Sequence, residues 1–91
     1  MGKILLEYEI RPEDPGVDMD KVLQEILSKV SSLKNIEVKN YSVEPFVFGM
    51  KMIKIEFVVP EEDEDAQDFL ESQIKGVKGV GEIELVYFTR L

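Results

Sequence analysis

Apolar and polar residues alternate along four short stretches of the chain. Alternation with a period of two is typical of β-strands that bury one face. The predicted strands cover residues 3–11, 36–43, 51–59 and 82–89. In the second strand the apolar positions change face part-way along, and a β-bulge near Lys39–Asn40 would bring them back together. In the last strand two faces are predicted: Ile83, Leu85 and Tyr87 on one, Val86 and Phe88 on the other.

Two further stretches repeat their apolar residues at steps of three and four, which predicts amphipathic helices. The first helix is expected from Met19 to about Leu33, with Asp18 as its N-cap. The second is shorter, and its apolar residues are Ala66, Phe69, Leu70 and Ile74. Glycines follow this stretch at positions where helices often end.

The predicted elements follow the order β-α-β-β-α-β. The simplest α+β arrangement for this order is the ferredoxin-like split βαβ sandwich, a four-stranded antiparallel sheet with two helices on one face. The first and third strands then lie in the centre of the sheet. The 91 residues are expected to form a single domain, residues 1–91. Because this fold hosts many unrelated functions, the function has to be inferred from a site.

Charge and composition narrow the possible functions. The chain has no cysteine and no histidine, which excludes disulfides and removes the commonest general base. Its formal net charge of −8 argues against direct nucleic-acid binding and is compatible with a basic protein partner. The central strands also lack the outward aromatic residues that stack on RNA bases. With no membrane-length apolar run and no signal-peptide pattern, a cytoplasmic protein without membrane contact is expected.

No arrangement of residues predicts a catalytic site. The carboxylates occupy scattered, exposed positions, and the serines have no base near them in the sequence. Glycines within residues 76–81 follow a helix instead of opening one, so they do not fit a dinucleotide-binding fingerprint. The acidic run 61–65 lacks the spacing of a calcium loop and is interpreted as a solvated loop and helix start. We therefore expect neither enzymatic activity nor a bound cofactor or metal.

The segment 44–51, which joins the second and third strands, is unusually apolar for a connection. Its sequence is Glu-Pro-Phe-Val-Phe-Gly-Met-Lys. Proline and glycine suit a turn, but folding alone would bury the two phenylalanines. The segment therefore either folds back onto the core or presents an aromatic surface to a partner. Phe46, at the root of the hairpin, is expected in the core, whereas Phe48 fits either position.

This segment resembles the "EPxxFGxK" motif of the elongation factor 1-beta family. The acidic run after the third strand, the stretch Ile74–Gly81 and the terminal Thr-Arg-Leu are similar to the same family. The similarity covers essentially the whole chain and matches the archaeal short form, which consists only of the exchange domain. The resemblance implies the ferredoxin-like fold. It also implies a guanine nucleotide exchange factor that promotes GDP release from elongation factor 1-alpha, the GTPase that delivers aminoacyl-tRNA to the ribosome.

The resemblance further implies which residues contact the partner. Phe48 corresponds to the aromatic residue of the loop. Eukaryotic members carry a penultimate lysine that disturbs the partner's magnesium site, and Arg90 stands at that position here. In the family the loop aromatic and the C-terminal end act together near the nucleotide and magnesium, so we expect Phe48 and Arg90 on one surface. The other predicted partner-binding residues are Pro45, Gly49, Lys51 and Leu91.

Two other functions stay open on the residues alone. One is a ferredoxin-like regulatory or ligand-binding interaction module that dimerises through its sheet. The other is an acyl-phosphate hydrolase in which Arg11, with Asn35 or Asn40, holds the phosphate. Against the second, Arg11 is followed by Pro-Glu-Asp-Pro, which supplies few backbone amides and adds repulsive charge.

Structural roles are also open for two of the cations. Lys51 is most simply a solvated residue at the start of a strand. Arg90 could form an ion pair with Glu7 or Glu9 across the sheet, and such an exposed pair contributes at most about 1 kcal/mol.

Overall fold

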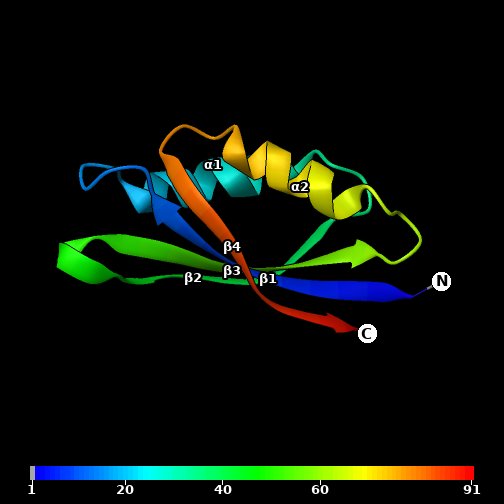
Figure 1. Cartoon of the computed structure of the whole chain (residues 1–91). Helices are drawn as coiled ribbons and strands as arrows, with labels where there is room; N and C mark the ends of the chain where they lie inside the picture. The colour runs from blue at the N-terminus through cyan, green and yellow to red at the C-terminus, as the bar shows by residue number, and fades with distance from the viewer. Residues whose placement is uncertain (1) are drawn as a thin grey trace.

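The computed structural model describes residues 2–91 and contains the predicted strands and helices in the predicted order (Figure 1). The elements are β1 Lys3–Pro12, α1 Met19–Ser31, β2 Glu37–Pro45, β3 Lys51–Pro60, α2 Ala66–Lys75 and β4 Val80–Arg90. A short 3-10 turn, Val47–Gly49, lies between β2 and β3. The boundaries predicted from the hydrophobic pattern are therefore correct to within about two residues.

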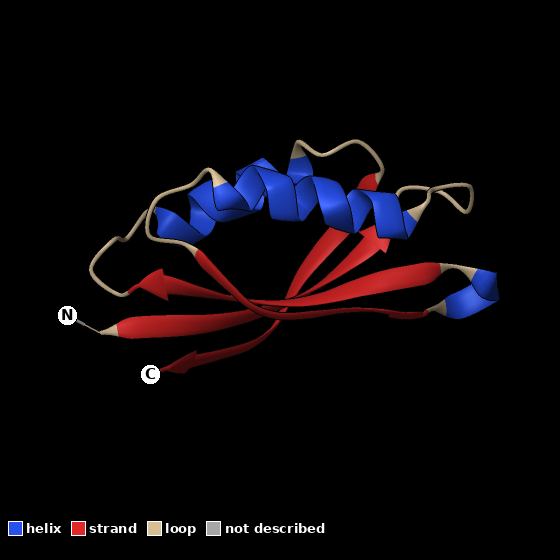
Figure 2. Ribbon diagram, turned by 180° about the vertical axis from the view of Figure 1, so that it is seen from behind, coloured by secondary structure: helices blue, strands red, loops and turns tan. Residues whose placement is uncertain are grey.

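The strands form one antiparallel sheet in the order β2-β3-β1-β4. Both helices lie on the same face of this sheet, and the other face is left open (Figure 2). This arrangement confirms the ferredoxin-like split βαβ sandwich, with β1 and β3 in the centre. It also makes β2 and β4 the two edge strands.

The core lies between the helices and the sheet, on the face predicted from the alternation. Ile10, Ile53 and Phe57 are fully buried there, and Ile26 of α1 and Leu70 of α2 close the core from the helix side. Burying each such side chain contributes about 1.5–3 kcal/mol. The central strands are thereby fixed in register against both helices.

A tyrosine in the core keeps its hydroxyl paired. Tyr8 is fully buried and packs edge-to-face against Phe57, with 6.0 Å between the ring centroids. Its hydroxyl donates a hydrogen bond of 2.7 Å to Oε2 of Glu71 on α2. Burial, followed by the hydrogen bond to Glu71, raises the pKa of the Tyr8 phenol above its ordinary value. The hydrogen bond ties α2 to the central strand.

The N-cap of α1 is the predicted one. The Asp18 carboxylate accepts hydrogen bonds from the backbone N–H groups of Asp20 (3.1 Å) and Lys21 (3.3 Å). The helix ends at Ser31 instead of about Leu33, because the chain turns there and Asn35 takes a left-handed φ of 67°.

Three register irregularities alter the alternation of the edge strands. One lies between Val38 and Asn40 of β2, where the sequence predicts it. The other two, in the pairing of β4 with β1, are not predicted. One is a bulge: Leu85 lies opposite Tyr8, Tyr87 lies opposite Glu7, and Val86 is the extra residue. The second lies near the start of β4, between the pairs Ile10–Ile83 and Pro12–Val80. Partners in register share a face, so the expected grouping of Tyr87 with Leu85 is wrong. Phe88, not Tyr87, is on the helix-bearing face.

The helices are short and amphipathic. Phe69, predicted on the buried face of α2, is 48% exposed, while its neighbour Leu70 is fully buried. Within residues 2–91, neither helix is long and apolar enough to cross a membrane.

Candidate functional site

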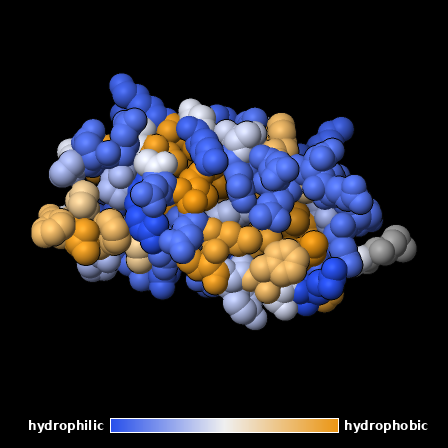
Figure 3. All heavy atoms as spheres, in the orientation of Figure 1, coloured by the Kyte–Doolittle hydropathy of each residue, from blue (hydrophilic) through white to orange (hydrophobic). Residues whose placement is uncertain are grey.

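The tip of the β2–β3 hairpin presents an exposed aromatic ring. Phe48 is 94% exposed and the adjacent Val47 is 50% exposed. Apolar side chains gather at this end of the molecule, on the left in Figure 3. Leaving a phenylalanine in water forgoes about 1.5–3 kcal/mol of burial free energy. Of the two possibilities for Phe48 left open by the sequence, the exposed one is observed.

The backbone of the tip is closed by its own hydrogen bonds. The Phe46 N–H donates to the Met50 carbonyl at 2.7 Å, and the Met50 N–H donates to the Val47 carbonyl at 3.1 Å. Phe48 has φ 56° and ψ 36°, and Gly49 has φ 75°. The left-handed region costs an L-residue about 1–2 kcal/mol, and a glycine almost nothing. The turn therefore stores backbone strain at the residue that carries the exposed ring, as functional loops often do.

The tip extends beyond the four-stranded part of the sheet. β1 pairs with β3 only as far as Ile10, which lies opposite Ile53. Lys51 and Met52 pair with β2, so this end of the hairpin is a two-stranded ribbon. On the helix side, the Lys51 Nζ lies 3.8 Å from a carboxylate oxygen of Asp20, and both side chains are exposed. So loose a pair contributes little to stability.

Phe46 is not part of the hydrophobic core, and the expectation that it would be buried there is wrong. It is half-buried, and the Arg11 guanidinium carbon lies 5.5 Å from the centroid of its ring. The reason is the pleat of β1: Ile10 faces the helices, so Arg11 points to the open face of the sheet. Phe46 meets Arg11 on that face, outside the layer that the helices cover.

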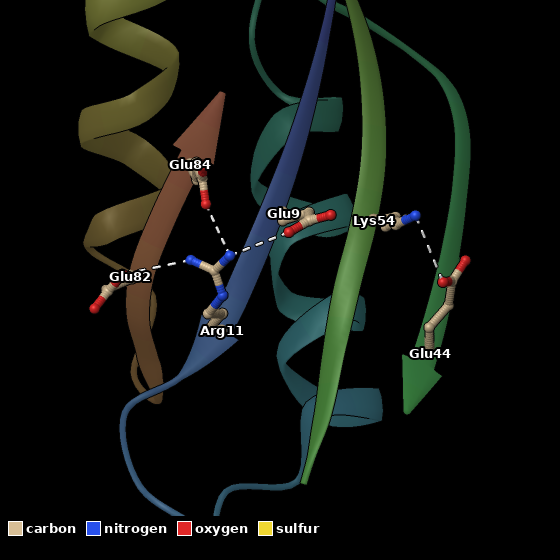
Figure 4. A network of polar contacts seen from close by, with 6 residues as sticks. All are labelled: Glu9, Arg11, Glu44, Lys54, Glu82 and Glu84. Atoms are coloured by element: carbon tan, nitrogen blue, oxygen red, sulfur yellow. Dashed lines mark hydrogen bonds and ion pairs between the residues drawn. The ribbon is translucent and has the colours of Figure 1, made fainter. Parts of the chain in front are cut away.

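Arg11 also contacts carboxylates from two strands (Figure 4). Its Nη2 lies 2.7 Å from Glu84 and 3.1 Å from Glu9, and its Nη1 lies 3.4 Å from Glu82. The hydrogen bond to Glu84 raises the pKa of Arg11 above its ordinary value. A guanidinium so occupied by carboxylates is poorly suited to hold an acyl phosphate, and that alternative gains no support.

The C-terminal residues lie at the end of β4. Arg90 is exposed, and its Nε lies 3.2 Å from Oε1 of Glu61, the residue after β3. The expected pairing with Glu7 or Glu9 is wrong, because Arg90 is opposite Ile4 and so lies on the helix-bearing face. The Leu91 N–H donates a 2.8 Å hydrogen bond to the carbonyl of β1 residue Lys3. Its side chain is nevertheless 61% exposed.

Phe48 and Arg90 lie at opposite ends of the sheet, and the expectation of one shared surface is wrong. β3 and β4 both run antiparallel to β1, so both start near the hairpin end and finish at the other end. Arg90 is thus beside Ile4, and the tip lies beyond Ile53 (Figures 1 and 2). A rise of about 3.3 Å per residue along β3 separates the two ends by roughly 30 Å.

A third exposed apolar area lies on β4 and was missed by the sequence analysis. Val86, Tyr87 and Phe88 are 40–52% exposed, and Leu85 is 37% exposed. The bulge at Val86 turns part of this run toward each face of the sheet. The sequence did contain a signal for this area. Residues 85–88 are apolar or aromatic at consecutive positions, which is unusual for a strand with one face in water.

The acidic residues within the described part of the chain do not form a metal site. Across residues 2–91, no group of three or more Asp, Glu, His or Cys side chains is placed to hold a metal ion. In the acidic run, the Asp63 carboxylate accepts a hydrogen bond from the Asp65 N–H at 3.1 Å, which is a local turn before α2.

Comparison with known families decides the membership of the chain. Residues 5–91 match the family model described as the EF-1 guanine nucleotide exchange domain. The chain belongs to this family. The resemblance inferred from the 44–51 segment is thereby confirmed.

Curated relatives in the exchange-domain family are proteins of nearly the same length. The chain is 36% identical over 91 residues to elongation factor 1-beta of Caldivirga maquilingensis, covering 100% of this chain and 98% of that protein. It is 35% identical over 90 residues to elongation factor 1-beta of Pyrobaculum neutrophilum (99% and 96%). With elongation factor 1-beta of Staphylothermus marinus the identity is 31% over 85 residues (93% and 92%).

Solved structures support the fold alone. The ACT domain from GTP pyrophosphokinase of Chlorobium tepidum superimposes with a TM-score of 0.64 at 18% identity, covering 98% of this chain and 99% of that one. The C-terminal domain of the MgtC protein from Mycobacterium tuberculosis gives a TM-score of 0.61 at 12% identity, covering 99% and 87%. At these identities the likeness concerns the ferredoxin-like architecture and not a shared ligand.

Proposed function

We propose that this chain promotes the release of GDP from elongation factor 1-alpha, so that GTP can take its place during translation elongation. The observation that carries the proposal is the family match, which spans residues 5–91. The relatives named elongation factor 1-beta, similar over nearly their whole length, support it. The exposed, strained aromatic tip suits a chain that acts by binding another protein.

The proposed mechanism needs no covalent chemistry by this chain. An exchange factor that binds the nucleotide-free GTPase more tightly than the GDP-bound form must weaken GDP binding by the same factor. Mg²⁺ helps to hold the nucleotide phosphates in such GTPases. A cation or an apolar wedge brought near the magnesium would therefore favour the empty state.

We assign the two parts of this task to the two ends of the molecule. Phe48 would anchor the chain on the partner, since aromatic side chains are enriched at protein interfaces and can fill a pocket of the partner. Arg90, with Leu91, would act near the magnesium and nucleotide. Because roughly 30 Å separates these ends, the partner surface would have to extend along the whole length of the sheet. Pro45, Gly49 and Lys51 would shape the hairpin that presents Phe48.

The test is the release of fluorescently labelled GDP from elongation factor 1-alpha. The rate is measured with excess unlabelled GDP, at increasing concentrations of this protein. We expect the rate to rise and to saturate, which gives a half-saturating concentration and a maximal rate. A release rate that stays at its spontaneous value at every concentration would overturn the proposal.

A further inference from the structure

A cation on the open face of the sheet supports the root of the hairpin. The Arg11 guanidinium carbon lies 5.5 Å from the centroid of the Phe46 ring. Phe46 is the residue immediately before the 3-10 turn, and its N–H closes the tip through the Met50 carbonyl. A guanidinium at this distance from a ring is attracted to the ring face. Arg11 thus contacts Phe46, the residue at which the hairpin tip begins.

This contact matters because the ribbon lies outside the four-stranded part of the sheet. Beyond Ile53 the hairpin no longer pairs with β1, and isolated two-stranded ribbons are only marginally stable in water. On the helix side, the loose pair between Lys51 and Asp20, at 3.8 Å, is the ion pair that reaches the ribbon. On the open face, Lys54 of β3 reaches Glu44 of the ribbon at 3.7 Å, and the contact between Arg11 and Phe46 connects the ribbon to β1.

Arg11 is itself held in place by its carboxylate partners. Glu9 comes from β1 and Glu84 from β4, at 3.1 Å and 2.7 Å, and Glu82 of β4 lies 3.4 Å away. The Arg11 side chain is only 23% exposed. The planar guanidinium can meet carboxylates at its edge and an aromatic ring at its face at the same time, which a lysine ammonium cannot do. Figure 4 shows Arg11 between the carboxylates of the two strands.

We propose that Arg11 is a positioning residue that fixes the hairpin root through Phe46 and so sets the direction in which Phe48 is presented. The inference rests on the proposed function, because it gives Arg11 a part in the same partner contact. Without Arg11 the ribbon would sample more orientations, and binding would have to pay the entropy of ordering it. The effect would therefore fall on affinity and not on the step that follows binding.

The experiment compares Arg11→Met with wild type and with Lys54→Met. Methionine keeps an unbranched apolar stem and removes the guanidinium. Lys54 is a matched control, because it lies on the same open face and pairs with Glu44 of β2 at 3.7 Å. Its replacement removes one positive charge and one contact with the hairpin strand without touching Phe46. Both variants enter the GDP-release assay, and their amide hydrogen exchange is followed residue by residue.

In Arg11→Met we expect faster exchange of the Phe46 and Met50 amides, with core amides unchanged. The half-saturating concentration should rise about fivefold, as expected for the loss of a cation–π contact. The maximal rate should be retained. Lys54→Met should match wild type in both measurements. In the double variant with Phe46→Leu, the Arg11 effect should largely disappear, because the two residues act through one contact.

Several results would overturn the inference. One is tip amides in Arg11→Met that exchange at the wild-type rate. Another is an Arg11→Met variant whose tip amides exchange hydrogen faster but whose half-saturating concentration for GDP release changes less than about twofold. A third is an Arg11 effect that persists in full in the Phe46→Leu background. A wild-type protein that does not stimulate GDP release would instead overturn the proposed function, before any variant is compared.

Discussion

Phe48 combines two unfavourable properties in one residue. Its ring is 94% exposed, and its backbone has the left-handed φ of 56°. The first forgoes burial free energy and the second costs about 1–2 kcal/mol. Neither property strengthens the fold, so the structure gives a reason to look for the value of this residue in binding. A phenylalanine at this position makes sense when another protein supplies the pocket.

Replacing Phe48 by alanine should weaken partner binding without harming the fold. We expect the half-saturating concentration for stimulated GDP release to rise about 30-fold, which corresponds to a hot-spot contribution of about 2 kcal/mol or more. The control is Phe69→Ala on α2, which removes a ring that is 48% exposed at another place. It should bind as wild type does. Equal stimulation by Phe48→Ala and wild type would exclude Phe48 as an anchor.

The buried tyrosine gives a prediction about pH. Burial raises the pKa of Tyr8 above its ordinary value of 10.0, and the hydrogen bond to Glu71 raises it further. The folded protein thus retains the phenol proton at a pH where the unfolded chain has released it. The buried, protonated phenol thereby contributes to the free energy of unfolding. This contribution is fully present below about pH 10 and is lost as the pH rises above it, by at most about 1.4 kcal/mol per pH unit.

Tyr8→Phe tests this linkage. The variant should lose about 1 kcal/mol of unfolding free energy at neutral pH, since the bond to Glu71 disappears. It should also lose stability less steeply than wild type above pH 10. Urea unfolding between about pH 7 and pH 11 measures both effects. A decline as steep in the variant as in wild type would show that Tyr8 is not the group responsible.

At the scale of elements, the last strand, β4, carries residues to which we assign a function. β4 carries the exposed residues Tyr87 and Phe88 and ends at Arg90. The ion pair of Arg90 with Glu61 is exposed, with 73% and 39% of the two side chains accessible. Such pairs contribute about 0–1 kcal/mol. The end of β4 can therefore change with little cost to the fold.

Removing Arg90 and Leu91 should accordingly reduce stimulated GDP release more than it reduces the stability of the fold. We expect the maximal rate of GDP release to fall at least about tenfold, because the cation proposed to act near the magnesium is lost. The unfolding free energy should fall by about 1–2 kcal/mol, from the Leu91 hydrogen bond and the ion pair. Glu61→Gln is the control, since it removes the same ion pair and keeps Arg90. A truncated chain that exchanges as fast as Glu61→Gln would leave Arg90 with a structural role only.

The sequence predicted features that depend on residues close together in the chain, and it missed features that depend on contacts between distant residues. Alternation within β1 and β3 depends on neighbouring residues, and it predicted the central strands and the layer they bury. The bulge at Val86 depends on pairing with β1 across the fold, and no local pattern contains that register. Phe46 was misassigned for the same reason: its surroundings include Arg11, which is distant in the sequence.

The individual residues of the candidate site were predicted, but their positions relative to one another were not. The resemblance indicated Phe48 and Arg90 individually, and both are exposed. Their placement at opposite ends follows from strand direction alone, because β3 and β4 run the same way along β1. The predicted strand order already contained that information, but the expectation of a shared surface combined the family resemblance with the incorrect assumption that the β2–β3 turn and the end of β4 lie at the same edge of the sheet.

At the scale of the whole molecule, the separation of the two ends predicts independent contributions to binding. The molecule extends 42 Å along its longest axis, and roughly 30 Å of strand separates the tip from Arg90. Sites this far apart, without shared contacts, usually contribute additively. The binding losses of Phe48→Ala and Arg90→Ala, measured as changes in affinity for nucleotide-free elongation factor 1-alpha, should sum in the double variant to within about 0.5 kcal/mol. A larger deviation would mean that the partner couples the two ends energetically.

The bulge at Val86 in β4 has a further consequence, for the behaviour of the protein at high concentration. β4 is an outer strand of 11 residues with exposed apolar side chains. A straight strand of this kind would be a template on which other copies could stack edge to edge, as in fibrils. The extra residue, Val86, interrupts the regular spacing of the free N–H and C=O groups. The glutamates near the start of the strand add repulsion between copies. The irregularity that the hydrophobic pattern did not predict therefore also works against edge-to-edge stacking of copies.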